Sequence, residues 1–161
     1  MKRIAVIGAG SWGTTLAQVL NDNGHKVSLW VRNPEKANKI AQSRYNADYL
    51  PQLKLADAIE ISSDLTQAVS NAEILLLAVP SHGMADLCCQ LSKITDCTDK
   101  VSVSCTKGFE YHSGLRMSEI IKSYFPSATV AVLSGPNHAE EIAIRQPSAT
   151  VIACQNEDVA T

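Results

Sequence analysis

The chain has 161 residues, 45% of them hydrophobic, which is enough for one domain with a buried core and too few for two domains of ordinary size. The net charge of −2 and the scattered basic residues create no positive field, so nucleic acid is not an expected partner. No apolar stretch approaches the roughly 20 residues that span a bilayer, and no cleavage site follows the first apolar run. We therefore expect a soluble, cytoplasmic protein without a membrane partner.

Seven short segments rich in Val, Ile and Leu predict strands, and helical patterns separate most of them. In chain order they are Ile4–Ile7, Lys26–Val31, Ile59–Ser62, Ile74–Val79, Val101–Ser104, Thr129–Leu133 and Thr150–Ala153. Several are continuous apolar runs, which is typical of strands covered on both faces. The alternation predicts an α/β fold of Rossmann type, a doubly wound and mainly parallel sheet with helices on both faces.

The first predicted strand leads into a glycine-rich turn, residues 8–13, and then into a helical stretch. In this context Gly8 permits the tight turn, Gly10 lets the backbone approach a pyrophosphate, and Gly13 lets the helix pack on the strand. Free N–H groups at the start of the helix attract the same anion. The pattern predicts a dinucleotide site, with a glycine turn that binds no ligand as the alternative.

The second predicted strand ends at Val31, where an acidic residue would normally hold the ribose hydroxyls of NAD. Arg32 and Asn33 stand there instead. A guanidinium can receive the 2′-phosphate of NADP in a bidentate manner, whereas a carboxylate would repel it. We expect NADPH to bind at least as well as NADH, against the alternative that Arg32 is an ordinary surface arginine.

Helix starts follow two of the strands. Asn33 before Pro34 predicts an N-cap, and Asp64 is expected to cap a short helix over Leu65–Ser70 in the same way. Between them, Tyr45–Ala58 lacks clean periodicity, which predicts a loop or a short irregular insertion near the cofactor edge of the sheet.

Ligands of open α/β sheets bind beyond the carboxyl ends of the strands, so the residues after each strand carry most of the functional information. After the fourth, fifth and sixth strands these are Pro80-Ser81-His82-Gly83, Thr106-Lys107-Gly108 and Ser134-Gly135-Pro136-Asn137-His138-Ala139. Small residues, a lysine and helix-starting amides at one edge favour a phosphate-bearing substrate beside a nicotinamide.

The five cysteines are odd in number and have no Cys-x-x-Cys spacing, which argues against a disulfide framework and against a zinc site, so no metal is expected. Cys105 follows a strand and precedes Lys107, but no histidine partner favours a nucleophile there over packing. Reduced and mostly packed thiols are the expectation.

Taken together, these motifs resemble the NAD(P)-dependent glycerol-3-phosphate dehydrogenases of bacterial type. The resemblance runs through the whole chain in order, over residues 8–14, Trp30 before Arg32, Tyr49-Leu50-Pro51, Val79-Pro80-Ser81-His82, Thr106-Lys107-Gly108 and residues 134–141. It implies an oxidoreductase that interconverts dihydroxyacetone phosphate and sn-glycerol 3-phosphate with NADP or NAD, making the glycerol backbone of phospholipids. A homodimer is a candidate assembly of the full-length protein.

The resemblance also implies site roles. The residues expected to line the cofactor, beside Gly8, Gly10 and Gly13, are Ser11, Trp12, Arg32, Tyr49, Lys107 and Ala139. Lys107, Gly135 and Asn137 are expected to meet the substrate. A lysine ammonium beside the reacting carbonyl stabilises negative charge on oxygen, so Lys107 is the expected catalytic residue, with an ordinary surface lysine as the alternative. His82 and His138 have no evident partner and are not assigned a role as acids.

Length is the departure from the family, whose members are about twice as long and carry a helical C-terminal domain with a second, proton-transferring lysine. Nothing in this chain matches that domain. We expect residues 1–161 to be the NAD(P)-binding domain of a longer protein and to be inactive alone. A β-hydroxyacid dehydrogenase, a ketopantoate reductase and a non-enzymatic dinucleotide-binding module stay open as alternatives.

Overall fold

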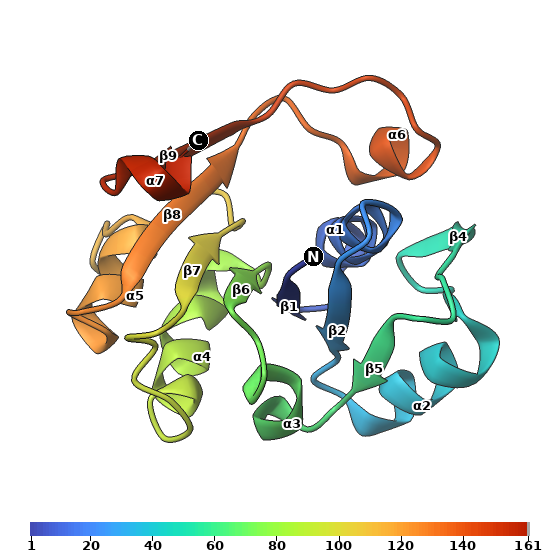
Figure 1. The fold of residues 1–161 in the computed structure, drawn as a ribbon, viewed down its shortest axis with the longest axis horizontal. Coiled ribbons are helices and arrows are strands. Elements are labelled where there is room, and N and C mark those ends of the chain that lie inside the picture. The colour runs from blue at the N-terminus through green and yellow to red at the C-terminus, as the bar shows by residue number, and fades with distance from the viewer. Residues whose placement is uncertain (161) are drawn as a thin grey trace.

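The fold is built on one seven-stranded sheet with the order β5-β2-β1-β6-β7-β8-β9, in a computed structural model that describes residues 1–160 (Figure 1). Every neighbouring pair is parallel except β8 and β9, which are antiparallel. The strands are β1 Arg3–Ile7, β2 Lys26–Trp30, β5 Glu60–Ser62, β6 Ile74–Leu77, β7 Val101–Ser104, β8 Thr129–Ser134 and β9 Val151–Cys154. All seven predicted strands are therefore present, with ends that differ by at most two residues.

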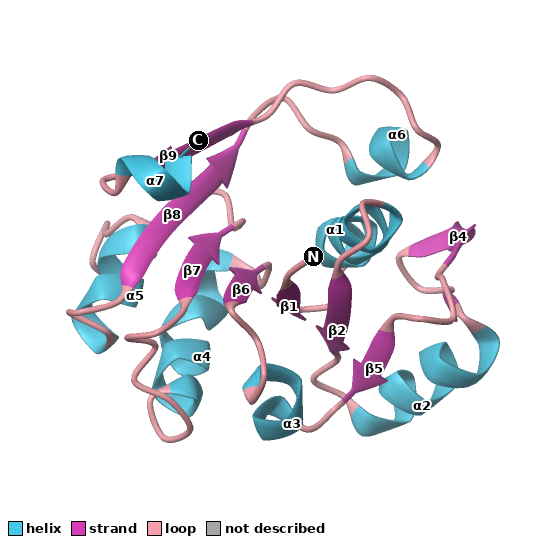
Figure 2. Cartoon of the chain, viewed as in Figure 1, coloured by secondary structure: helices cyan, strands magenta, loops and turns pink. Residues whose placement is uncertain are grey.

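Helices cover both faces of this sheet (Figure 2). Residues of α1 (Ser11–Asp22) and α2 (Pro34–Ser43) pack in one core cluster, and residues of α3 (Leu65–Val69), α4 (Met84–Leu91) and α5 (Met117–Tyr124) pack in the other. The short elements η1 (Ser81–Gly83), α6 (Ala139–Ala143) and α7 (Glu157–Ala160) complete the chain. This arrangement confirms the doubly wound Rossmann-type fold.

Alternation along the central strands explains why two cores form. In β1, Ile4 and Val6 belong to the α1 and α2 cluster, whereas Ala5 and Ile7 belong to the cluster of α3, α4 and α5. Successive side chains of a strand point to opposite faces, so a continuous apolar run feeds both cores at once. Burial of each large aliphatic side chain contributes about 1.5–3 kcal/mol.

The segment after α2 corrects one expectation. Tyr45–Ala58 was expected to be a loop or an irregular insertion, but it contains a small antiparallel hairpin of β3 (Tyr45–Asn46) and β4 (Leu50–Lys54). Leu50 and Leu55 are fully buried, so the hairpin has an apolar anchor of its own. The buried Asn46 amide donates hydrogen bonds to the Ala9 carbonyl (2.9 Å) and to Thr14 Oγ1 (2.8 Å), which tie the hairpin to the glycine turn.

Both predicted helix caps are confirmed. The side chain of Asn33 accepts a hydrogen bond from the Lys36 amide at the start of α2, and that of Asp64 accepts one from the Gln67 amide at the start of α3. Each cap satisfies one of the four backbone N–H groups that the first turn of a helix leaves free.

The cysteines are free thiols, as expected, and most are packed. Cys88, Cys97 and Cys105 are buried, Cys154 is half-buried and Cys89 is exposed. Burial raises the pKa of the Cys88 and Cys105 thiols to about 12, which keeps both neutral and unreactive near neutral pH.

Within residues 1–160, no helix has the length and apolarity needed to cross a membrane. Within the same residues, no cluster of three or more His, Cys, Asp or Glu side chains is placed to hold a metal ion.

Candidate dinucleotide-binding site

The first strand, β1, lies inside the sheet, and the later strands are added on both sides of it. From β1 the chain proceeds to β2 and β5 on one side, and it then returns to place β6, β7 and β8 on the other. Loops diverge where the strand order reverses, and they leave a crevice beyond the carboxyl ends of β1 and β6. A cavity of about 950 Å³ lies there, lined by Gly8 and Ala9 after β1 and by Ala78, Val79 and Pro80 after β6. This volume is in the upper range of ligand cavities, about 300–1,000 Å³.

The three glycines of the turn differ in what surrounds them. Gly8 has a φ of +115°, and a Cβ on it would lie 2.5 Å from the Ala78 carbonyl oxygen. A Cβ on Gly13 would overlap the carbonyl oxygen of Gly8 and lie 3.0 Å from its carbon. These two positions therefore have the structural roles that the pattern predicts, a tight turn and close contact of helix and strand.

Gly10 is different, because a Cβ placed there would have no atom within 4 Å, although the residue lines the cavity. It is the N-terminal capping residue of α1, and no side-chain hydrogen bond caps the helix. The amides of the first turn are therefore available to a ligand, and the dipole of this 12-residue helix favours an anion. An open glycine in front of free amides fits a pyrophosphate.

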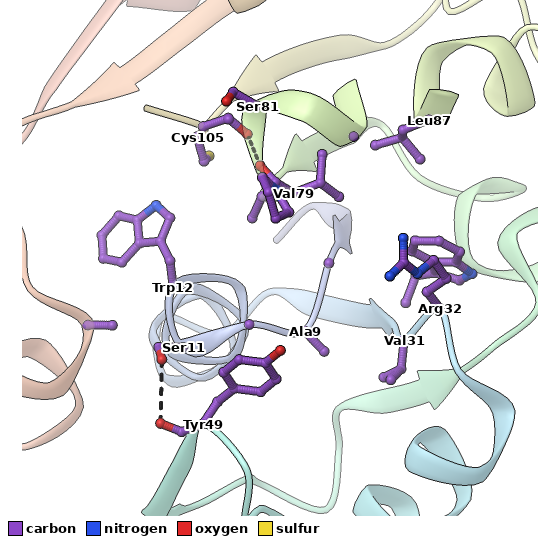
Figure 3. Close-up of a pocket in the computed structure, with 18 of the residues that line it drawn as sticks. Ala9, Ser11, Trp12, Val31, Arg32, Tyr49, Val79, Ser81, Leu87 and Cys105 are labelled. Atoms are coloured by element: carbon purple, nitrogen blue, oxygen red, sulfur yellow. Dashed lines mark hydrogen bonds between the residues drawn. The ribbon is translucent and has the colours of Figure 1, made fainter. Parts of the chain in front are cut away.

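Two more sequence-predicted residues, Ser11 and Trp12, follow this turn at the start of α1, and both line the cavity. Ser11 Oγ donates to the Tyr49 carbonyl at 3.4 Å, so the turn of the β3–β4 hairpin is held beside the helix N-terminus. Figure 3 shows Trp12 and Arg32 on opposite sides of the cavity, with Ala9 between them. An extended ligand that crosses the glycine turn would therefore have one end near each of these side chains.

At the Arg32 end, the cavity is lined by residues that follow β2, by the start of α2 and by the hairpin. Arg32, Asn33 and Lys36 belong to this wall, and Tyr49 closes it from the hairpin side. Arg32 and Tyr49 are exposed, and neither Arg32 nor its neighbour Asn33 has a carboxylate partner among residues 1–160. This end offers positive charge and an aromatic ring to a ligand, and the prediction that Arg32 and Tyr49 contact the cofactor stays a prediction.

At the Trp12 end, the loops after β7 and β8 bring Lys107, Asn137 and Ala139 to the same cavity. Lys107 Nζ donates to the Asn137 carbonyl at 3.4 Å, which places the ammonium beside the loop that follows β8. Thr15 Oγ1 donates to the Ala139 carbonyl at 3.1 Å and so attaches that loop to α1. The Lys107 ammonium is thereby held by the loop after β8, and that loop is in turn held by α1.

The buried side chain of Asn137 is only partly satisfied. Its amide nitrogen donates to the Ala149 carbonyl at 2.8 Å, whereas its buried Oδ1 finds no donor in the part of the chain that the structure describes. An unpaired buried oxygen costs about 1–3 kcal/mol, and such sites in native proteins call for a partner. This oxygen lies against Gly135, which does not line the cavity.

Gly135 is placed differently from the other predicted substrate residues. It does not line the cavity, and its φ is +155°. A Cβ there would lie 2.7 Å from the Ala149 carbonyl oxygen and 2.9 Å from Asn137 Oδ1. The glycine leaves room for the chain's own backbone and for the Asn137 side chain, so its observed contribution is to the shape of the loop.

Sequence reasoning did not single out two residues that shape the site. Asn46 holds the glycine turn from the hairpin, and Lys36 adds a second cation to the wall that contains Arg32. The spacing of Lys36, one helical turn after the Asn33 cap, was the only available signal. The cavity is also lined by Cys105, His82 and His138. The raised pKa of the Cys105 thiol agrees with a packed side chain and not with a nucleophile.

Comparison with known proteins agrees with this geometry. Residues 3–160 match the family model described as NAD-dependent glycerol-3-phosphate dehydrogenase N-terminus. The chain is 45% identical to a glycerol-3-phosphate dehydrogenase [NAD(P)+] of Corynebacterium glutamicum, over 99% of its own length and 48% of the relative's. For the enzyme of that name from a Thermoanaerobacter species the identity is 42%, over 96% of this chain and 46% of the relative.

A solved structure gives the same result. The crystal structure of glycerol-3-phosphate dehydrogenase from Coxiella burnetii superposes with a TM-score of 0.92 at 29% identity, covering 98% of this chain and 48% of that one. This chain thus spans about half the length of the relatives it matches. With a family model matched over residues 3–160, the chain belongs to the NAD-dependent glycerol-3-phosphate dehydrogenase family and corresponds to its N-terminal part.

Proposed function

We propose that this chain is the cofactor-binding part of an enzyme that transfers hydride between NAD(P)H and dihydroxyacetone phosphate, giving sn-glycerol 3-phosphate. The proposal rests on one continuous cavity at the switch point, which joins the open Gly10 turn to Lys107. A module that only binds a dinucleotide would have no need for the Lys107 ammonium in that cavity, held by the Asn137 carbonyl.

The residues of this chain have distinct parts in the proposed reaction. The amides after Gly10 bind the pyrophosphate, Arg32 receives the 2′-phosphate of NADP, and Tyr49 covers the adenosine end. When bound, the reduced nicotinamide supplies a hydride to the carbonyl carbon of the substrate, and a proton is added to the carbonyl oxygen. Lys107 stabilises the negative charge that develops on this oxygen, and the carbonyl of Asn137 orients the ammonium.

The remaining parts of the proposal concern the longer protein. The relatives are about twice as long as this chain, and we propose that the remainder is a helical domain that supplies the proton-transferring lysine and the groups that bind the substrate phosphate. Asn137 completes the substrate side from this chain, and Gly135 shapes the loop that carries it. The enzyme is proposed to work in the cytoplasm, where its product supplies the glycerol backbone of phospholipids, and to form a homodimer.

Calorimetric titration of the chain with NADPH and with NADH tests the proposal first. We expect saturable binding of one dinucleotide per chain, because the glycine turn and the α1 amides all belong to residues 1–160. Absence of binding by both dinucleotides would contradict the proposed function. In the longer protein, oxidation of NADPH that depends on dihydroxyacetone phosphate distinguishes the enzyme from a non-catalytic module.

A further inference from the structure

A second cation stands at the wall of the cavity where Arg32 lies. Lys36 is in the first turn of α2, three residues after the Asn33 cap, and lines the cavity together with Arg32. Its Nζ donates to Asp48 Oδ2 at 2.5 Å and lies 5.8 Å from the centroid of the Tyr49 ring. The ammonium is thus held between the helix and the hairpin, at the edge of the cavity.

This position is unfavourable for a lysine in terms of the helix alone. The first turn of a helix carries a partial positive charge, which favours anions and disfavours cations by about 0.3–1 kcal/mol. Asp48 offsets part of that cost, but the lysine and the aspartate are both about half exposed, where an ion pair contributes little. Native proteins break such local rules chiefly at functional sites.

We propose that Lys36 is a second receptor for the 2′-phosphate of NADP, and therefore a residue that sets the preference between NADPH and NADH. The inference rests on the proposed function, because it assumes that the adenosine end of the dinucleotide lies at Arg32. The start of α2 and the Lys36 side chain face the same volume as Arg32. A phosphate there would meet a guanidinium on one side and an ammonium on the other.

Asp48 has a defined part in this arrangement. It does not line the cavity, so it holds the ammonium from outside and leaves the cavity side to a ligand. Its hydrogen bond with Lys36 raises the pKa of the lysine and lowers its own, which keeps both groups charged. The carboxylate also competes with a phosphate for the same ammonium. Removal of this charge should therefore strengthen NADPH binding.

The chain contains a matched control in Lys39. It lies on the same helix, is exposed and carries the same charge, but it does not line the cavity. Lys36→Gln and Lys39→Gln therefore change the net charge equally, and the difference between them isolates the local contact from the general field. Lys36→Arg keeps a cation at the site and serves as the conservative variant.

The experiment is calorimetric titration of each variant of the chain with NADPH and with NADH. For Lys36→Gln we expect the Kd of NADPH to rise about three- to tenfold and that of NADH to change less than about twofold. Lys36→Arg should restore most of the NADPH affinity, and Lys39→Gln should change both constants less than about twofold. Asp48→Asn should lower the Kd of NADPH about two- to threefold.

The outcomes separate this inference from the proposed function. If the wild-type chain binds both dinucleotides and Lys36→Gln weakens them equally, or weakens neither, Lys36 is not a receptor for the 2′-phosphate. An effect of Lys39→Gln as large as that of Lys36→Gln would also overturn the inference. If Asp48→Asn leaves NADPH binding unchanged or weaker, Asp48 does not compete. Failure of the wild-type chain to bind either dinucleotide overturns the proposed function and this inference together.

Discussion

Replacement of Gly10 by valine should weaken dinucleotide binding strongly while leaving the fold intact. Gly10 has φ −77° and ψ −176°, which any L-residue adopts, and a Cβ there meets no atom within 4 Å. Valine is a poorer N-cap than glycine, so the free energy of unfolding of the variant should fall by about 1 kcal/mol. For a chain of this size that is a shift of roughly 2–4 °C in Tm.

The expected loss of affinity follows from the same geometry. The added side chain has only the cavity to occupy, where it separates a pyrophosphate from the amides of the first turn of α1. Losing one or two hydrogen bonds to a charged group costs about 1.5–3 kcal/mol each, so a loss of about 3 kcal/mol corresponds to roughly 150-fold in Kd.

Gly13→Ala is the contrasting control, because its Cβ overlaps the Gly8 carbonyl oxygen in the folded chain. Overpacking of this kind typically costs about 1–3 kcal/mol or more, so this variant should lose stability as well as binding. Calorimetric titration with NADPH and thermal unfolding by circular dichroism give the two quantities for each variant. A Gly10→Val chain that binds NADPH as tightly as the wild type would refute the assigned site.

Three further predictions concern other parts of the site and the core. Arg32→Ala should weaken NADPH by about 1–3 kcal/mol and NADH much less, and equal losses in parallel titrations would exclude it as the discriminator. The chain alone should show negligible NADPH oxidation with dihydroxyacetone phosphate, because it lacks the proposed proton-transferring lysine and general acid–base catalysis is worth about 10²–10⁴ in rate. In the longer protein, Lys107→Ala should remove most of the activity. Turnover by the chain alone, or a Lys107→Ala enzyme with unchanged activity, would contradict these assignments. Because burial raises the folded-state pKa of the Cys88 and Cys105 thiols to about 12, from 9.0, their contribution to stability is complete below about pH 9 and is lost as the pH rises toward 12. Denaturant midpoints should fall over that range, and a smaller fall in Cys105→Ala would identify one of the groups, whereas a flat pH profile would refute the argument.

The strands and the glycine turn could be predicted from the sequence because their signals are local. Runs such as residues 74–79 are apolar throughout, and only a strand covered on both faces needs that pattern over so short a length. The capping residues Asn33 and Asp64 act within three residues of their own position. The antiparallel direction of β9 was not predictable, because an apolar run does not indicate whether a strand pairs parallel or antiparallel with its neighbour.

The features that sequence reasoning missed depend on contacts between distant residues. The β3–β4 hairpin has a two-residue strand, and the Asn46 side chain binds it to a turn that lies more than thirty positions earlier. Gly135 was expected to leave room for a substrate, but the Ala149 carbonyl occupies the space beside it. Neither contact leaves a periodic or spaced pattern. Lys36 belongs to the same group, because its partner Asp48 comes from the hairpin.

We propose that the crevice beyond β1 and β6 binds the dinucleotide with its pyrophosphate against the start of α1. Titration of the ¹⁵N-labelled chain with NADPH, followed by amide chemical shifts, locates the bound dinucleotide residue by residue. We expect saturable shifts that are largest at the amides of residues 8–13, with smaller ones at Arg32 and Tyr49. Saturation with the largest shifts elsewhere, for example around residues 92–98 and 124–127 where a second, smaller cavity lies, would contradict it.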